Sequence, residues 1–232
     1  MIPVVWLASY PRSGNTMLRI ILAQCFKLPS AAAYPEDFNG NHTLQELTGR
    51  IAPTSEGVID FGDVPVRIIK THGRPQDGSK AIYIVRNGID ATASFHDHGN
   101  RRIPIETLIC GRPGLPRWCE HIAWWTPSSR PGTMMLKYED VVADTGGTVD
   151  ALADFLHVAP VAHSIPARDD LAAVDGKWVR SASAPGRTRL SPGEEEHFWQ
   201  LNGDTMMEYG YSRWPKSQET DYPAPRVLRS SG

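Results

Sequence analysis

A short polar stretch near the start of the chain combines residue types that bind anions. Residues 10–16 read Tyr-Pro-Arg-Ser-Gly-Asn-Thr and lie between two apolar segments. Where such a stretch leads into a helix, unpaired backbone N–H groups and the helix dipole attract negative charge. Gly14 lets the backbone approach an anion closely, Arg12 adds positive charge, and hydroxyl donors come from Ser13 and Thr16. The stretch predicts a phosphate-binding loop, and a plain side-chain cap of the helix is the alternative.

A second group of reactive side chains, Lys70 and His72, follows a predicted strand. A histidine with its ordinary pKa of about 6.5 can remove a proton from a hydroxyl or an amine at neutral pH. Lys70 can neutralise negative charge on a transferred group or on a leaving phosphate. A lone histidine is usually a surface or capping residue, but its position after a strand and beside a lysine favours a catalytic base.

Arg86 ends another predicted strand, and Ser94 stands eight residues later in a predicted helix. A guanidinium group can bind two oxygens of one phosphate, and a hydroxyl from the following helix supplies a further donor. Both side chains are therefore suited to binding an anion. A surface ion pair is the alternative role for Arg86.

Alternating strands and helices must position these side chains. Strands are predicted over residues 4–9, 66–70, 81–86 and 133–137, and helices over 17–26, 43–50, 89–98, 118–128, 148–157 and 191–210. This order predicts an α/β fold of three layers, in which helices flank a central, mostly parallel sheet. Ligands of such sheets bind at the carboxyl ends of the strands, so we expect the phosphate loop and His72 to lie at one edge.

The last predicted helix carries sequence signals at both ends. Ser191 fits the N-cap, Pro192 fits the first helical position, and Glu194 completes a capping box. Gly210 is a natural stop.

The remaining stretches are expected to be less regular. Residues 29–63 are predicted to be irregular apart from the helix at 43–50, and residues 159–190 to be irregular and basic. We predict one domain over residues 1–213 and a flexible tail over residues 214–232.

Composition excludes several classes of protein. The net charge of −2 over 232 residues argues against nucleic acid as a partner. Three cysteines argue against a disulfide scaffold, and no apolar run approaches the ~20 residues of a membrane span. The first residues have no basic region, so we expect no signal peptide and a cytoplasmic protein.

Five segments resemble motifs of the PAPS-dependent sulfotransferases, of the cytosolic or bacterial small-molecule type. Residues 10–16 resemble the family's Y-P-K-S-G-T/N-T loop, and residues 70–72 its K-T-H. Residues 83–94 resemble its 3′-phosphate segment, 124–125 its paired tryptophans and 136–140 its Y-E-D segment. The resemblance implies a P-loop-like fold that uses 3′-phosphoadenosine 5′-phosphosulfate (PAPS), releases adenosine 3′,5′-bisphosphate (PAP) and needs no metal.

The resemblance also implies a role for individual residues. It makes His72 the base, with Lys70 and Arg12 stabilising the charge of the reacting group. The implied nucleotide ligands are Arg12, Ser13, Gly14, Asn15, Thr16, Met17, Arg86, Ser94, Tyr138 and Arg180. Arg12 departs from the usual lysine of the loop, and Met17 replaces an aromatic residue that packs against adenine.

Two other functions remain as alternatives at this stage. A P-loop kinase or nucleotide hydrolase would carry G-x-x-x-x-G-K-S/T, but residues 10–16 lack the first glycine and the lysine. A non-catalytic nucleotide-binding protein of the same fold would not need both Lys70 and His72.

The acceptor is not defined by any motif. We expect a small molecule or a glycoconjugate, bound by a monomer or a homodimer. Candidate residues for its pocket are Phe38, His42, Phe61, His96, Trp118 and Trp124. A metal site is not expected, because the cysteines and histidines between His96 and His121 do not follow zinc spacing.

Overall fold

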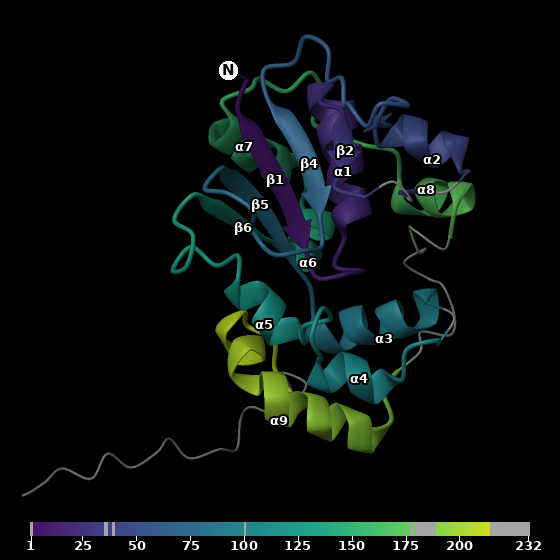
Figure 1. The fold of residues 1–232 in the computed structure, drawn as a ribbon, viewed down its shortest axis with the longest axis vertical. Helices are drawn as coiled ribbons and strands as arrows, with labels where there is room; N and C mark the ends of the chain where they lie inside the picture. The colour runs from purple at the N-terminus through teal and green to yellow at the C-terminus, as the bar shows by residue number, and fades with distance from the viewer. Residues whose placement is uncertain are drawn as a thin grey trace, which may run out of the picture.

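A parallel β-sheet lies at the centre of the molecule (Figure 1). The computed structural model describes residues 2–34, 37–38, 40–99, 101–176, 179 and 189–213. Its strands are β1 (Val4–Ser9), β2 (Ser30–Ala32), β3 (Arg50–Ile51), β4 (Arg67–Thr71), β5 (Lys80–Val85) and β6 (Thr133–Lys137). They run in the order β3-β2-β4-β1-β5-β6, and every pair is parallel. The predicted central sheet is confirmed.

Helices cover both faces of this sheet and make the predicted three layers. They are α1 (Asn15–Phe26), α2 (His42–Leu47), α3 (Gly88–His98), α4 (Ile105–Cys110), α5 (Trp118–Ala123), α6 (Tyr138–Ala143), α7 (Thr145–Leu156), α8 (Arg168–Val174) and α9 (Pro192–Glu208). Successive residues of β1 face opposite sides, as the pleat of a strand requires. Leu7 packs with α1 and α7, whereas Trp6 and Ala8 pack with α3, α5 and α9.

The chain crosses to opposite faces of the sheet after β1 and β5, which are neighbours in the sheet. β1 leads into α1 on one face, and β5 leads into α3 on the other. Figure 1 shows α3, α4, α5 and α9 grouped beyond the arrowhead of β1. Such a switch opens a crevice at the carboxyl ends of the strands, where α/β proteins bind ligands.

Several short elements were missed by the sequence analysis. β2 and β3 lie in the stretch 29–63 that was predicted to be irregular, and α8 lies in 159–190. A strand of three residues shows no periodicity, so only its pairing with β4 identifies it. The helix predicted over 118–128 ends at Ala123, after which the chain tightens into turns around Pro127.

The ends of α9 confirm the sequence signals. The Ser191 side chain accepts a hydrogen bond from the Glu194 backbone N–H, and the Glu194 carboxylate accepts one from the Ser191 N–H, at 3.4 and 2.7 Å. Gly210 follows the helix with a left-handed φ of 71°. In the described ranges, no helix combines the length and the apolar character that crossing a membrane requires. The predicted tail, 214–232, lies outside these ranges.

Candidate functional site

The loop between β1 and α1 is held by the backbone and not by a side-chain cap. Gly14 is the N-cap of α1, and no side chain accepts a hydrogen bond there. The alternative interpretation of the loop as a plain Ser or Asn cap is therefore wrong. Arg12 and Gly14 both have left-handed backbones, with φ of 68° and 108°. These turns leave the N–H groups that begin α1 available to an anion.

Gly14 is required by space as well as by its backbone angle. A Cβ atom at Gly14 would lie 2.3 Å from Cδ2 of Tyr138 and 3.1 Å from Cδ1 of Ile84. Tyr138, the first residue of α6, therefore packs directly over the loop. Its position beside the predicted nucleotide site is a consequence of this contact.

The other side chains of the loop point in different directions. The Ser13 hydroxyl is buried and has no hydrogen-bond partner among the described residues. Asn15 turns back to β1, where its Nδ2 donates to the Leu7 carbonyl and to Ser9 Oγ, at 3.3 Å each. Met17 is buried in the core on the α1 face of the sheet, and Thr16 is half-buried. Ser13 thus leaves a buried donor for a ligand.

The two predicted phosphate sites are brought together at the carboxyl ends of β1 and β5. Arg12 Nε donates to Ser94 Oγ at 3.3 Å, and Arg86 Nη1 donates to the Arg12 carbonyl at 3.0 Å. The Arg86 guanidinium also lies 4.9 Å from the centre of the Tyr138 ring. Arg86, directly after β5, Ser94 of α3 and Tyr138 of α6 thus meet the loop at one place. Arg180, the remaining predicted nucleotide ligand, lies outside the described residues.

His72 follows β4 and faces the end of β1. Its Nδ1 lies 2.7 Å from the Ser9 carbonyl oxygen, which can only accept, so Nδ1 carries the proton and Nε2 is left as the basic nitrogen. Burial, followed by the positive charge of Lys70, lowers the pKa of His72 well below its ordinary value. The ring also stacks on Tyr34, with 6.2 Å between the ring centres. The arrangement keeps His72 neutral and ready to accept a proton.

Lys70 lies in a pocket of charge behind His72. Its Nζ is 3.1 Å from Asp37 Oδ1 and 4.4 Å from the centre of the Tyr34 ring. Asp37 also accepts a 2.5 Å hydrogen bond from the fully buried Arg19. Burial, together with the guanidinium groups of Arg19 and Arg12, lowers the pKa of Lys70 to about 6. A polyanion beside Lys70 would raise this pKa again.

Three residues that support His72 and Lys70 were not predicted from the sequence. Tyr34 and Asp37 lie in a stretch without a recognisable motif, so no pattern identified them. Arg19 carried a signal, because a charged residue inside the apolar segment 17–26 must find a buried partner.

His121 is a further buried residue near His72. Its Nε2 lies 2.9 Å from the His72 carbonyl oxygen, and its Nδ1 lies 2.9 Å from the Tyr83 hydroxyl.

Two of the residues predicted to line an acceptor pocket lie in the core instead. Phe38 and Trp118 are almost completely buried in the core, so the idea that they line an acceptor pocket is wrong.

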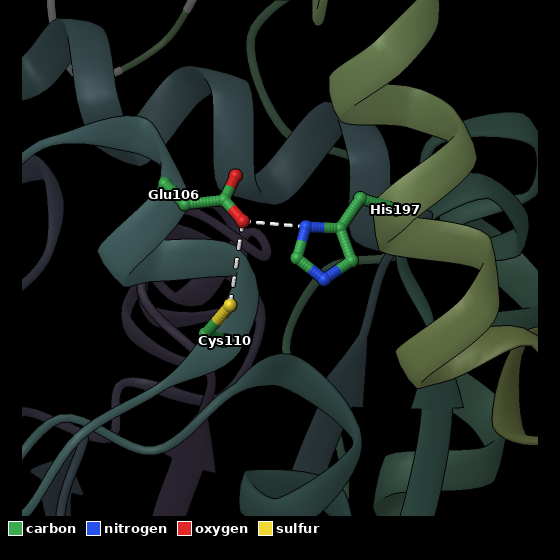
Figure 2. A group of neighbouring side chains, drawn as sticks. All are labelled: Glu106, Cys110 and His197. Carbon is green, nitrogen blue, oxygen red and sulfur yellow. Dashed lines mark hydrogen bonds and ion pairs between the residues drawn. The ribbon is translucent and has the colours of Figure 1, made fainter.

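A separate group of potential metal ligands lies between α4 and α9 (Figure 2). Within the described part of the chain, the ligand atoms of Glu106, Cys110 and His197 lie within 4.8 Å of one another. His197 Nδ1 is 2.5 Å from a Glu106 oxygen, and the Cys110 thiol donates to the same oxygen at 3.5 Å. All three side chains reach solvent, and this ion pair explains the grouping without an ion. Among the described residues, Cys110 is not grouped with Cys119 or His121 as a potential metal site.

Comparison with known proteins extends these observations. The family model for the sulfotransferase domain matches residues 3–166. Cytosolic sulfotransferase 1 of Danio rerio is 25% identical in an alignment over 181 residues that covers 66% of this chain and 58% of the relative. Sulfotransferase 1E1 of Mus musculus is 25% identical over 179 residues, covering 68% and 60%. The chain thus spans about 60% of the length of these curated relatives.

Solved structures share the fold at low sequence identity. Mouse sulfotransferase SULT7A1 complexed with PAP has a TM-score of 0.56 and 18% identity, over 89% of this chain and 84% of that one. Retinol dehydratase in a complex with retinol and PAP has a TM-score of 0.56 and 17% identity, over 91% and 83%. At these identities the likeness concerns the fold.

Proposed function

Because this chain belongs to the sulfotransferase domain family, we propose that it transfers the sulfuryl group of PAPS to a hydroxyl or an amine. One observation carries the proposal. His72, whose pKa is lowered by burial and whose Nδ1 bonds to the Ser9 carbonyl, follows β4, and the neighbouring strand β1 leads into the predicted phosphate loop. Proton removal and anion binding are the two functions that sulfuryl transfer to a neutral acceptor requires.

The residues of the crevice fit a nucleotide with two separate phosphate groups. The loop offers backbone N–H groups and the buried, unpartnered hydroxyl of Ser13 to the 5′ end. Arg86, directly after β5, and Ser94, in α3, are suited to the 3′-phosphate. Tyr138 packs over Gly14 and offers an aromatic surface next to both.

In the proposed reaction, the residues of this chain position the reactants and handle one proton. His72 Nε2 takes the proton of the acceptor as the acceptor atom forms its bond to sulfur. The bond between sulfur and the bridging phosphate oxygen breaks in line with that attack, and PAP leaves. Arg12 and Lys70 stabilise the charge that grows on the bridging and sulfuryl oxygens.

The acceptor class and the cellular setting are part of the proposal. We infer an acceptor with a hydroxyl or amine group, small or carried on a glycoconjugate, because His72 is suited to removing one proton from such a group. The cytosolic relative supports a cytoplasmic location. Monomer and homodimer are both compatible with the family.

The direct test is a transfer assay with PAPS and a panel of phenols, alcohols and amines. We expect turnover by the wild type, a loss of about 10²–10⁴-fold in kcat for His72→Ala, and retained PAP binding. His163→Ala, at an exposed histidine, is the matched control and should be fully active. Full turnover by His72→Ala would eliminate the proposed base.

A ligand screen separates the proposal from its nucleotide-binding rivals. A ligand that binds only the native state raises the melting temperature. PAP should raise it more than ATP or GTP at equal concentration, with or without magnesium. A larger shift with magnesium and ATP would favour a kinase or hydrolase instead.

A further inference from the structure

A continuous chain of hydrogen bonds connects the phosphate loop with the segment that carries His72. The Tyr10 backbone N–H, where the loop begins, donates to the Tyr83 hydroxyl at 3.2 Å. The Tyr83 hydroxyl lies 2.9 Å from His121 Nδ1, and His121 Nε2 lies 2.9 Å from the His72 carbonyl oxygen. The two ends of the chain are therefore the two functional parts of the crevice.

The direction of every hydrogen bond in this chain is determined. The His72 carbonyl can only accept, so His121 Nε2 carries a proton and donates it. Burial lowers the pKa of His121 to about 4, so its other nitrogen, Nδ1, is an acceptor at neutral pH. Burial raises the pKa of Tyr83 well above its ordinary value, so its hydroxyl keeps the proton that it donates to His121.

The groups that form this chain are enclosed by packing. Tyr10, Tyr83 and His121 expose no more than 1% of their surface. Tyr10 and Tyr83 pack against the His121 ring, with ring centres 5.9 and 5.7 Å apart. A buried polar group that loses its partner costs free energy, so the side chains of Tyr83 and His121 are held by the hydrogen bonds that they make with each other, with the Tyr10 N–H and with the His72 carbonyl.

His121 lies in α5, and a tryptophan that follows this helix holds Gly73, the residue after His72. Trp125, just after α5, donates from its indole Nε1 to the Gly73 carbonyl at 3.2 Å. Two successive carbonyls, those of His72 and Gly73, are thus fixed from one side. On the other side, His72 Nδ1 donates to the Ser9 carbonyl. The backbone and the ring of His72 are therefore held by separate contacts.

We propose that His121 and Tyr83 are positioning residues that fix the His72 ring relative to the phosphate loop. The inference rests on the proposed function, since it concerns the alignment of His72 with a sulfuryl group bound at that loop. His121 does not touch the reacting atoms in this arrangement. His121 acts through the His72 backbone. Loss of His121 should therefore change the orientation of the His72 ring, whereas the imidazole that serves as the proposed base remains present.

The test compares His121→Phe with His121→Gln. Phe retains an aromatic ring and removes both hydrogen bonds, whereas Gln retains an amide donor and a carbonyl acceptor. We expect His121→Phe to lower kcat by about 10–100-fold, because a displacement of ~1 Å in a reacting group costs this much. KM for PAPS should change by less than about threefold. His121→Gln should recover most of the lost kcat, and Tyr83→Phe should show a smaller loss.

Two measurements keep the outcome interpretable. Rates are divided by the fraction of enzyme that binds PAP, so that unfolded protein does not count as slow protein. NMR of the imidazole nitrogens then reports whether His72 still carries its proton on Nδ1. We expect the Nδ1–H form in the wild type and a mixture of tautomers in His121→Phe. His163→Phe, at an exposed site, is the matched control.

The results separate this inference from the proposed function. If the wild type transfers sulfate and His121→Phe matches it in kcat and in the His72 spectrum, the positioning role is wrong. If equal losses occur in Phe and Gln variants, the hydrogen bonds are not the cause and the inference is again overturned. If the wild type transfers nothing, the proposed function fails, whereas an altered His72 tautomer in His121→Phe would still support the positioning contact.

Discussion

Two groups of polar side chains in this molecule each contain a histidine, but one group is buried and the other is exposed to solvent. At the carboxyl ends of the strands, here called the rim of the sheet, His121 donates to the His72 carbonyl and accepts from the Tyr83 hydroxyl. Its side chain is almost completely buried. Between α4 and α9, His197 and Cys110 both converge on one carboxylate of Glu106 and all three reach solvent (Figure 2). Water can replace any partner in the second group but none in the first. Because the hydrogen bonds at the rim are buried, their groups are held in one fixed geometry.

The largest expected effect is at Asp37, the buried carboxylate that pairs with Arg19 and Lys70. Asp37→Asn should reduce the free energy of unfolding by about 3–5 kcal/mol, because Arg19 would remain buried without its counter-ion. Urea denaturation measures the loss. Asp150→Asn, at an exposed carboxylate paired with His163, is the matched control and should lose less than ~1 kcal/mol. Equal losses in the two variants would contradict the contrast between buried and exposed groups.

A second variant tests whether space at the rim is as restricted as its polar contacts. Gly14→Ala should destabilise the protein by about 2–3 kcal/mol and weaken PAP binding, since its Cβ would meet Tyr138 at 2.3 Å in a left-handed backbone. Gly40→Ala is the matched control, because Gly40 has a φ of 73° and nothing within 4 Å of a Cβ. It should show about 1 kcal/mol from the backbone alone. Thermal unfolding and PAP titrations would show whether the two variants differ.

The depressed pKa of Lys70 predicts a pH-dependent affinity. A bound polyanion raises the pKa of Lys70 from about 6, so PAP binding takes up a proton at neutral pH. The titration of Lys70 should make the affinity for PAP fall as the pH rises above 6, by at most about tenfold per pH unit. Calorimetry in buffers of different ionisation enthalpy measures the proton uptake. Subtracting the Lys70→Met profile removes the titration of the ligand, and an unchanged profile in that variant would contradict the assignment.

The smallest effect is expected in the exposed group. Glu106→Gln should change the free energy of unfolding by less than ~1 kcal/mol, although it alters the contacts with His197 and Cys110. Tyr83→Phe, which removes a single oxygen from the buried chain, should lose about 1–3 kcal/mol. A larger loss in Glu106→Gln would show that solvent exposure is a poor guide to these contacts.

The sequence predicted those parts of the fold that depend on local patterns. The apolar run at Val4–Ser9 and the capping box at Ser191 and Glu194 were identified correctly, because a buried strand and a helix start have local signatures. β2 and α8 were missed, since elements of three and seven residues are defined by their packing. The roles assigned to His72, Lys70, Arg86 and the other ligands remain predictions.

By itself, the sequence determined the order of the longer strands and helices, and it predicted an anion-binding loop at residues 10–16 and a base after β4. The tertiary structure decided which groups contact His72. Tyr83 and His121 are 38 residues apart and reach His72 only because β5, α5 and β4 pack together. Local propensity carries no information about such contacts, whereas the need to satisfy every buried polar atom selects one arrangement of them in the folded chain.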